Sequence, residues 1–146
     1  MRITYKGDYA LKVILNLSLH YGGGLVTIHD LARRLDIPVK FLEQILLDLK
    51  RGGFLQSRRG KIGGYSLAKA PAKIKLGEVI RFIDGPVSPV ACVDKSYKGC
   101  SDITTCVFRE IWQRIAASTA AIIDNITFED LTKKIKRAGK ALVYQI

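Results

Sequence analysis

The chain has 146 residues, of which 48% are hydrophobic, and a formal net charge of +11 at pH 7. This length suggests one domain, or one small domain with an appended helix, and the hydrophobic content suffices for a core. Lys6, Asp8 and Lys12 interrupt any apolar run at the N-terminus, and no stretch is apolar enough to cross a bilayer, which argues against a signal peptide and a membrane span. We therefore expect a cytoplasmic protein with reduced thiols and no membrane partner.

The first predicted element is a helix over residues 8–21, where apolar side chains recur every three or four positions. Asp8 would stand at its start, where a carboxylate caps free N–H groups and favours the helix dipole. The three glycines at 22–24 would end it.

Two short helices joined by a tight turn follow. Thr27 and Asp30 resemble a capping box at the start of the first, and Pro38 suits the first position of the second, which runs to about Arg51. The pair predicts a helix-turn-helix. Recognition helices contact bases with their N-terminal turns, and the candidates there are Val39, Lys40, Phe41, Glu43 and Gln44.

The candidates differ in the chemistry that they offer a base pair. Gln44 could bond an adenine edge, and Lys40 a guanine or a phosphate. Glu43 repels phosphate unless it accepts from a cytosine amine, so it could act against wrong sequences.

A two-stranded hairpin is predicted directly after the third helix, from residues 54–57 and 65–68. Its tip has three cations, Arg58, Arg59 and Lys61, and three glycines, so its backbone can approach a phosphate chain closely. Between Asp48 and Glu78 the sequence has eight Lys and Arg residues and no acidic residue. A solvated surface is the alternative, but charge, helix pair and wing together favour DNA contact.

A short helix over residues 76–83 would close this part of the chain. The stretch 86–106 that follows holds all three cysteines, Cys92, Cys100 and Cys106, and shows neither a helical nor a strand period. Thiolates suit iron–sulfur clusters, zinc and copper(I), but the C-x7-C-x5-C spacing matches neither a zinc knuckle nor a standard ferredoxin pattern. The spacing alone leaves a metal site and free cysteines equally open.

A long helix is predicted after Cys106, because apolar residues follow a heptad-like seam. The seam consists of Phe108, Trp112, Ile115, Thr119, Ile122 and Ile126. Packing onto the chain's own core is one interpretation. Ile111, Ala116 and Ile123 give the helix a second apolar face, however, so it can serve its own domain and a partner at once, and a dimer suits palindromic DNA sites. Thr127 would cap a last short helix that runs to about Arg137.

With these residues placed, the chain resembles the IscR/NsrR (Rrf-two) family of bacterial winged-helix iron–sulfur regulators over about residues 1–131. The matching stretches are Met1–Ile3, Gly7–Leu11, Phe41–Ile45, Ser57–Gly60, Gly63–Leu67, the three cysteines and Trp112. The resemblance implies a homodimeric transcription factor with a [2Fe–2S] or [4Fe–4S] cluster on its cysteines. It also implies that Arg59 enters a minor groove of double-stranded DNA, and that Glu43 and Gln44 face the major groove of a palindromic operator.

The fourth cluster ligand implied by the resemblance depends on the branch of the family. IscR-like members have a histidine three residues after the last cysteine, where this chain has Arg109, which cannot ligate. NsrR-like members use a carboxylate at the start of the first helix, given by the other subunit, and Asp8 stands at that position. The implied site therefore consists of Cys92, Cys100 and Cys106 with Asp8 from the partner subunit.

We thus predict a mainly α protein, a winged helix-turn-helix with a two-stranded β wing, a cysteine loop and a long C-terminal dimerisation helix. The expected divisions are a DNA-binding domain (1–85), a cluster-binding loop (86–106), and the dimerisation helix with a short C-terminal helix (107–146). The expected function is transcriptional regulation, as a repressor whose cluster senses nitric oxide, redox state or iron–sulfur supply. The alternatives are a cluster-free member of the family that uses cysteine redox or zinc, and an iron–sulfur electron-transfer protein. No catalytic set stands out, so we expect no enzyme.

Overall fold

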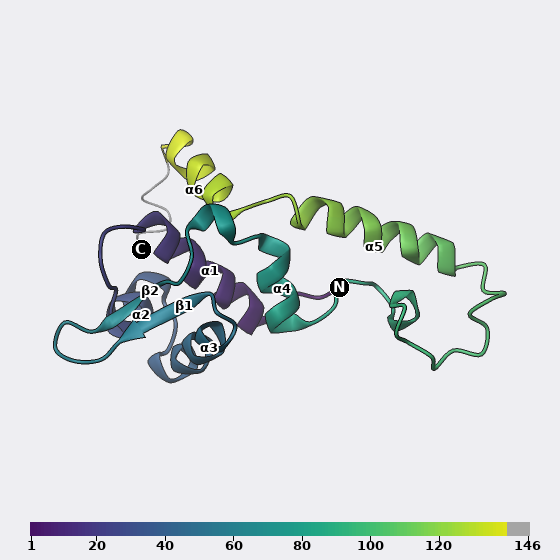
Figure 1. Ribbon diagram of the computed structural model, residues 1–146, viewed down its shortest axis with the longest axis horizontal. Coiled ribbons are helices and arrows are strands. Elements are labelled where there is room, and N and C mark those ends of the chain that lie inside the picture. The colour runs from purple at the N-terminus through teal and green to yellow at the C-terminus, as the bar shows by residue number, and fades with distance from the viewer. Residues whose placement is uncertain (140–146) are drawn as a thin grey trace.

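The computed structural model, which describes residues 1–139, has six helices and one hairpin in that range (Figure 1). The helices are α1 (Tyr5–Leu19), α2 (Ile28–Leu35), α3 (Val39–Arg51), α4 (Leu76–Asp84), α5 (Arg109–Ile123) and α6 (Phe128–Arg137). The strands are β1 (Leu55–Arg58) and β2 (Gly64–Leu67), and the 3-10 turns are η1 (Pro71–Lys73) and η2 (Ala91–Val93). The predicted fold class, mainly helical with a two-stranded wing after the third helix, is confirmed. The predicted division 107–146 extends past the described residues at 140–146.

Helix α1 runs through the middle of the compact body, between α3 and the hairpin on one side and α6 on the other (Figure 1). Its residues Ala10, Val13, Ile14 and Leu17 recur at helical spacing and are at most 3% exposed. They belong to one core with residues of α2, α3, α4, α6 and the hairpin. The apolar residues that recur along α1 therefore form the part of the core against which the other elements pack.

The start of α1 differs from the prediction. The helix begins at Tyr5, and the hydroxyl of Thr4 accepts the N–H of Gly7 at 3.0 Å as its N-cap. Asp8 lies in the first turn and pairs with Lys12 at 2.7 Å. The expectation that Asp8 starts and caps the helix is wrong, because a threonine one turn earlier already satisfies the free N–H group.

The hairpin is antiparallel, with Leu55 opposite Leu67 and Ser57 opposite Tyr65. Both strands are shifted by one residue from their predicted bounds, which is within the usual uncertainty of strand ends. Val26 forms a bridge to Tyr65, so the segment between α1 and α2 lies along the outer edge of β2. The hairpin is thus fixed to the body at its base, and its turn remains at the surface.

Helix α5 extends away from the compact body (Figure 1) and is tied to it at its C-terminal end. The Arg81 guanidinium on α4 holds the Asp124 carboxylate with two bonds, of 2.5 and 3.0 Å. The same hydrogen bonds lower the pKa of Asp124 below its usual value. Ile123 is buried in a small cluster with Ile80 and Val87. No helix in the described part of the chain is long and apolar enough to span a membrane.

The long helix ends before the last member of its predicted seam. Ile126 lies beyond α5, half-buried, and its carbonyl accepts the N–H of Leu76 at 2.9 Å. The N–H of Phe128 bonds to Ile74 at 3.0 Å in the same segment. Ile126 therefore connects the start of α4 with the segment that leads into α6. The expectation that Ile126 belongs to the long helix is wrong, because α5 ends at Ile123.

Gly77 gives a test of the junction between α4 and α5. A Cβ at this position would overlap Oδ1 of Asp124 and come within 2.8 Å of Nη1 of Arg81. Gly77→Ala should therefore displace the ion pair and lower the free energy of unfolding by about 1–3 kcal/mol. In an Asp124→Ala background the same change should cost much less, because no carboxylate stands in the way. Urea unfolding of the four proteins measures both costs, and equal costs in the two backgrounds would contradict this account.

Candidate nucleic-acid interface and cysteine loop

The N-terminal half of α3 has one buried and one exposed side. Leu42, Ile45, Leu46 and Leu49 are buried in the core. Of the predicted base-contacting residues, Val39 is half-buried and four are exposed, namely Lys40, Phe41, Glu43 and Gln44. This division follows from helical spacing, because residues three and four apart share a face.

A groove of about 350 Å³ lies between α3 and the hairpin. It brings together Glu43 from the helix with Arg58 and Arg59 from the hairpin. Leu47, Lys50 and Tyr65, which the sequence analysis did not single out, also line the groove. Lys50 donates to the hydroxyl of Ser57 at 2.7 Å and so connects α3 to β1. Leu47 and Lys50 follow Glu43 by four and seven positions, a spacing that could have identified them.

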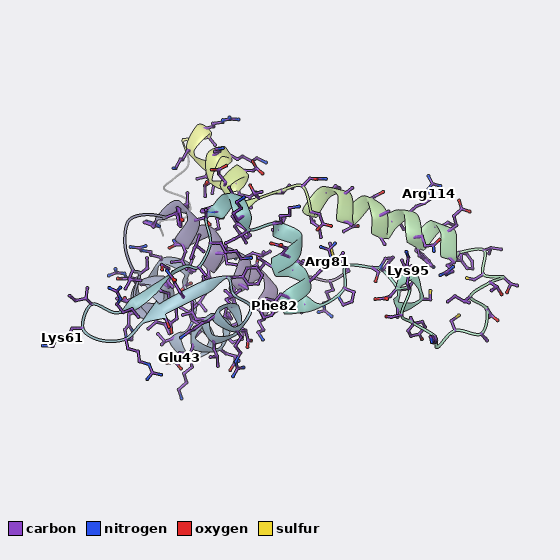
Figure 2. The ribbon with its side chains drawn as sticks, in the orientation of Figure 1. Glu43, Lys61, Arg81, Phe82, Lys95 and Arg114 are labelled. Carbon is purple, nitrogen blue, oxygen red and sulfur yellow. The ribbon has the colours of Figure 1, made fainter. Side chains whose placement is uncertain are left out.

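The tip of the hairpin projects from the body, and Figure 2 shows Lys61 at its far end. Gly60 has a positive φ of 113°, which favours glycine. A Cβ on Gly63 would overlap the carbonyl oxygen of Arg58, which cannot move without distorting the turn. The glycines therefore allow a narrow turn that presents Arg59 and Lys61 beyond the surface of α3.

Gln44 is held by a carboxylate that the sequence analysis did not consider. Its Nε2 donates to Oδ1 of Asp48 at 3.2 Å, and Lys6 on α1 lies 2.5 Å from the other oxygen of Asp48. The hydrogen bond from Lys6 is the largest effect and lowers the pKa of Asp48 below its usual value. Burial opposes it, and the weaker hydrogen bond from Gln44 lowers the pKa further. Asp48 stays ionised at neutral pH and orients the Gln44 amide.

Phe41 packs against helix α1. Its ring meets the ring of Tyr9 edge to face, with centroids 5.6 Å apart. Lys12 lies 5.6 Å from the centroid of Tyr9 and also pairs with Asp8. Phe41 therefore contributes to the position of α3 on α1, although it is 39% exposed.

The three cysteines lie in a segment whose regular structure is confined to η2. Cys92, Cys100 and Cys106 are half-buried, and none is in a disulfide. Residues 1–139 contain no group of three or more His, Cys, Asp or Glu side chains placed to hold a metal ion. One chain therefore does not bring the three cysteines of the predicted ligand set to one centre. The donor types suit an iron–sulfur cluster or zinc, but the loop would have to rearrange around it.

Arg109 provides an unmet hydrogen-bond donor beside the last cysteine. Its backbone N–H bonds to the carbonyl of Cys106 at 3.3 Å. Its side-chain Nε is buried and has no acceptor among the described residues. A buried donor without a partner costs about 1–3 kcal/mol, so this nitrogen favours an acceptor that residues 1–139 do not supply.

The N-terminal segment lies beside the start of the cysteine loop. Asp84, the last residue of α4, accepts the backbone N–H of Thr4 at 3.0 Å and its hydroxyl at 2.5 Å. The N-terminal amine donates to the carbonyl of Ser88 at 3.4 Å. Lys6, two residues after Thr4, reaches Asp48 on α3. One short segment thus contacts both the loop and α3.

Helix α5 leaves an apolar stripe exposed. Ile111, Ile115 and Ile122 are 49%, 43% and 62% exposed, and Phe108 before the helix is 59% exposed. A shallow groove of about 380 Å³ runs along the stripe and also includes Thr119. The expectation that Ile111 shares a second face with Ala116 and Ile123 is wrong, because Ile111 lines this groove. Trp112 is half-buried. Ala116 and Ala120 instead line a hollow with residues 86–88, so the helix has one face on its own chain and one in solvent.

Comparisons with known proteins agree with this arrangement. Residues 3–134 match the Rrf2 family, described as an iron-dependent transcriptional regulator. An rrf2-like HTH-type transcriptional regulator of Rhodobacter capsulatus is 39% identical over 96% of this chain and 98% of its own length. The structure of CymR, the global cysteine regulator of Bacillus subtilis, has a TM-score of 0.77 at 30% identity, over 92% of this chain and 98% of that chain. IscR of T. potens has a TM-score of 0.75 at 29% identity, over 94% and 90%. The chain belongs to the Rrf2 family of winged-helix transcriptional regulators, as its sequence motifs predicted.

Proposed function

We propose that this chain represses transcription as a homodimer on a palindromic operator, with α3 in the major groove and the hairpin tip in the adjacent minor groove. The observation that carries the proposal is the groove where Lys50, Arg58 and Arg59 converge beside α3. Cations at this position neutralise phosphates and release counterions. Phosphate contacts of this kind fix the register of the protein, and α3 then meets the base edges.

The Gln44 amide can still form two hydrogen bonds to an adenine base while it is bonded to Asp48. Its Nε2 carries two hydrogens, so one can remain on Asp48 while the other donates to adenine N7, and Oε1 accepts from N6. Lys6 fixes Asp48, and Asp48 in turn limits the rotamers of Gln44. The pair therefore reduces the entropy that base contact would cost.

The partner that we propose for the exposed stripe on α5 is a second copy of the chain. Isolated exposed apolar side chains are ordinary, but three of them in one groove, Ile111, Ile115 and Ile122, support an interface there. An isologous contact between two α5 helices would place two copies of α3 about a two-fold axis, as a palindrome requires. Trp112 and Thr119 border the stripe and belong to the proposed interface.

The cysteine loop is proposed to hold an iron–sulfur cluster on Cys92, Cys100, Cys106 and Asp8 of the partner subunit. The buried Nε of Arg109, on the residue three positions after Cys106, has no acceptor among the described residues, which supports a further group bound near the end of the loop. A bound cluster supplies a redox-active centre whose stability responds to oxidants, nitric oxide or iron–sulfur supply. The contacts of Thr4 with Asp84 and of Lys6 with Asp48 would connect the loop with α3.

A second candidate mechanism uses the thiols themselves. The three cysteines are half-buried and are not gathered around a centre in the described residues, which is compatible with disulfide chemistry or zinc binding after rearrangement. The similarity to CymR, whose Staphylococcus aureus structure is described as an oxidized form, supports this alternative within the same class of DNA-binding protein. The metal content of the purified protein separates the two mechanisms.

Arg59→Ala tests the role of the hairpin in DNA binding. Operator affinity should fall, and the slope of log K against log salt should decrease by about 0.9, because one phosphate contact is lost. Lys134→Ala removes an exposed cation from α6, on the other side of the body, and serves as the control. Fluorescence anisotropy on an operator selected in vitro measures both. If Arg59→Ala binds with unchanged affinity and salt slope, the hairpin does not contact DNA.

Ile122→Glu tests the proposed dimer. A carboxylate within the stripe should leave the chain monomeric at micromolar concentration and weaken operator binding, because each half-site is then bound alone. Ala117→Glu places the same charge on an exposed position outside the stripe and should remain dimeric. Sedimentation equilibrium gives the answer, and a monomeric wild type would refute the interface.

Anaerobic purification tests the cluster. Wild type should contain iron and acid-labile sulfide in equal amounts, and Cys100→Ala should contain neither. Asp8→Asn should keep its thermal stability but lose iron faster, since an amide binds iron less well than a carboxylate. Asp102→Asn makes the same change of carboxylate to amide within the cysteine loop and should behave as wild type. Zinc without sulfide, or no metal with reversible disulfide formation, would instead establish the thiol mechanism.

A further inference from the structure

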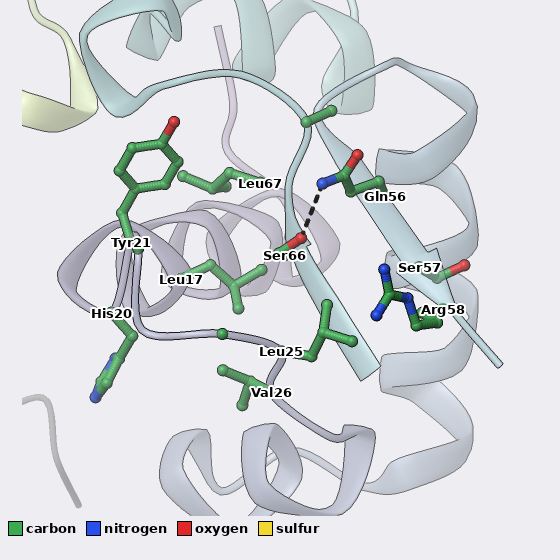
Figure 3. Close-up of a pocket in the computed structure, with 13 residues that line it drawn as sticks. Leu17, His20, Tyr21, Leu25, Val26, Gln56, Ser57, Arg58, Ser66 and Leu67 are labelled. Carbon is green, nitrogen blue, oxygen red and sulfur yellow. Dashed lines mark hydrogen bonds between the residues drawn. The ribbon is translucent and has the colours of Figure 1, made fainter. Parts of the chain in front are cut away.

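A second groove, of about 630 Å³, lies on the opposite side of the hairpin from α3. It is bounded by the end of α1, by the glycine-rich turn at 22–26 and by the outer face of the hairpin (Figure 3). Its volume is within the range of small-molecule sites. The DNA interface proposed above lies on the α3 side of the hairpin. It shares Ser57 and Arg58 with this groove but does not account for the other residues that line it.

The groove has an apolar floor and a polar wall. Leu17, Val26 and Leu67, which are at most 7% exposed, form part of the floor. The polar wall is the pair Gln56 and Ser66, which face each other across the hairpin and are joined by a 3.2 Å hydrogen bond (Figure 3). Gln56 donates in this bond, so its Oε1 can still accept and the Ser66 hydroxyl can still donate to a ligand.

Arg58 contributes the permanent charge of the groove. It follows Gln56 by two positions on β1, so both side chains lie on the same face of the strand. No Asp or Glu is among the residues that line this groove in the described chain. An apolar floor, a hydrogen-bonding wall and one guanidinium together match an organic carboxylate with an apolar body.

We propose that this groove binds a small organic carboxylate, whose acid group pairs with Arg58 and whose apolar body covers Leu17 and Leu67. Arg58 also lines the groove beside α3, so the same residue joins the two sites. A ligand that neutralises Arg58 removes one of the hairpin's three cations and weakens operator binding, and DNA weakens ligand binding by the same factor. This consequence for DNA rests on the proposed function, whereas the binding itself does not.

Binding is tested first without DNA, on the full-length protein, by calorimetry with naphthylacetate as the probe. Naphthylacetate should bind saturably, and its uncharged analogue naphthylacetamide at least about tenfold more weakly, because the charge-assisted bond to Arg58 is lost. Ala68→Trp, at an exposed position that lines the groove, should abolish binding. Ala72→Trp, at an exposed position on η1, is the matched control and should bind as wild type.

Arg58→Gln gives a second test that does not depend on filling the groove. This variant should bind acid and amide equally, whereas wild type discriminates between them. Any of three results would overturn the proposal. Wild type could bind the two probes equally, it could fail to bind naphthylacetate at millimolar concentration, or its binding could be unchanged by Ala68→Trp.

Operator affinity is then measured with and without saturating naphthylacetate. The affinity should fall several-fold in wild type and not in Arg58→Gln. Unchanged affinity in wild type would refute the coupling. Failure of the ligand-free protein to bind any DNA would count against the proposed function instead, and the calorimetry would still decide whether the groove is a site.

Discussion

The burial of helix α1 is the constraint on which the rest of the structure depends. Val13, Ile14 and Leu17 are almost fully removed from solvent, and burial of each such side chain contributes about 1.5–3 kcal/mol. The recognition helix, the hairpin, α4 and α6 all pack against α1 and its neighbours in one core. The relative positions of α3 and the hairpin, which define the groove at the proposed DNA interface, are therefore set by a helix that need not touch DNA itself.

The polar contacts around α1 extend this constraint to the cysteine loop. Asp84 holds Thr4 at the start of α1, and Asp48 holds Lys6 in its first turn. A Cβ on Gly7 would overlap the Asp84 carboxylate, so the chain can approach this closely only at a glycine. Because the loop begins directly after Asp84, a change in its conformation acts on the same residues that orient α3. Coupling between loop and DNA then requires only that the two loop states favour different positions of this segment.

Charge and apolar contact act against each other in the proposed dimer. Each copy carries a net charge of +11, so two copies repel unless an apolar seam or a polyanion compensates. The stripe of Ile111, Ile115 and Ile122 offers the apolar seam, and operator phosphates would offer the countercharge. Dimerisation and DNA binding should therefore reinforce each other, most strongly at low salt where repulsion is least screened.

The sequence by itself determined the elements whose cause is local. The order of helices and strands followed from helical spacing, from the capping residues Thr27 and Thr127, and from the glycine-rich turn of the hairpin. The sequence motifs identified the family. The exposed residues of α3 followed from the same spacing. The start of α1 was predicted wrongly at Asp8, one turn after the observed cap Thr4, because Asp and Thr both cap well and the local pattern does not separate them.

Only the tertiary structure decided the contacts between residues distant in the chain. Three such contacts are the ion pair of Lys6 with Asp48, the ion pair of Arg81 with Asp124, and the backbone hydrogen bond from Leu76 to Ile126. No local sequence pattern predicts which segments these contacts join. The groove beneath Gln56 and Ser66 likewise exists only because the end of α1 and the hairpin meet. The free energy of a local element depends on residues that are neighbours in the chain, so it can be judged from the sequence. The free energy of a long-range contact depends on where packing places its two partners.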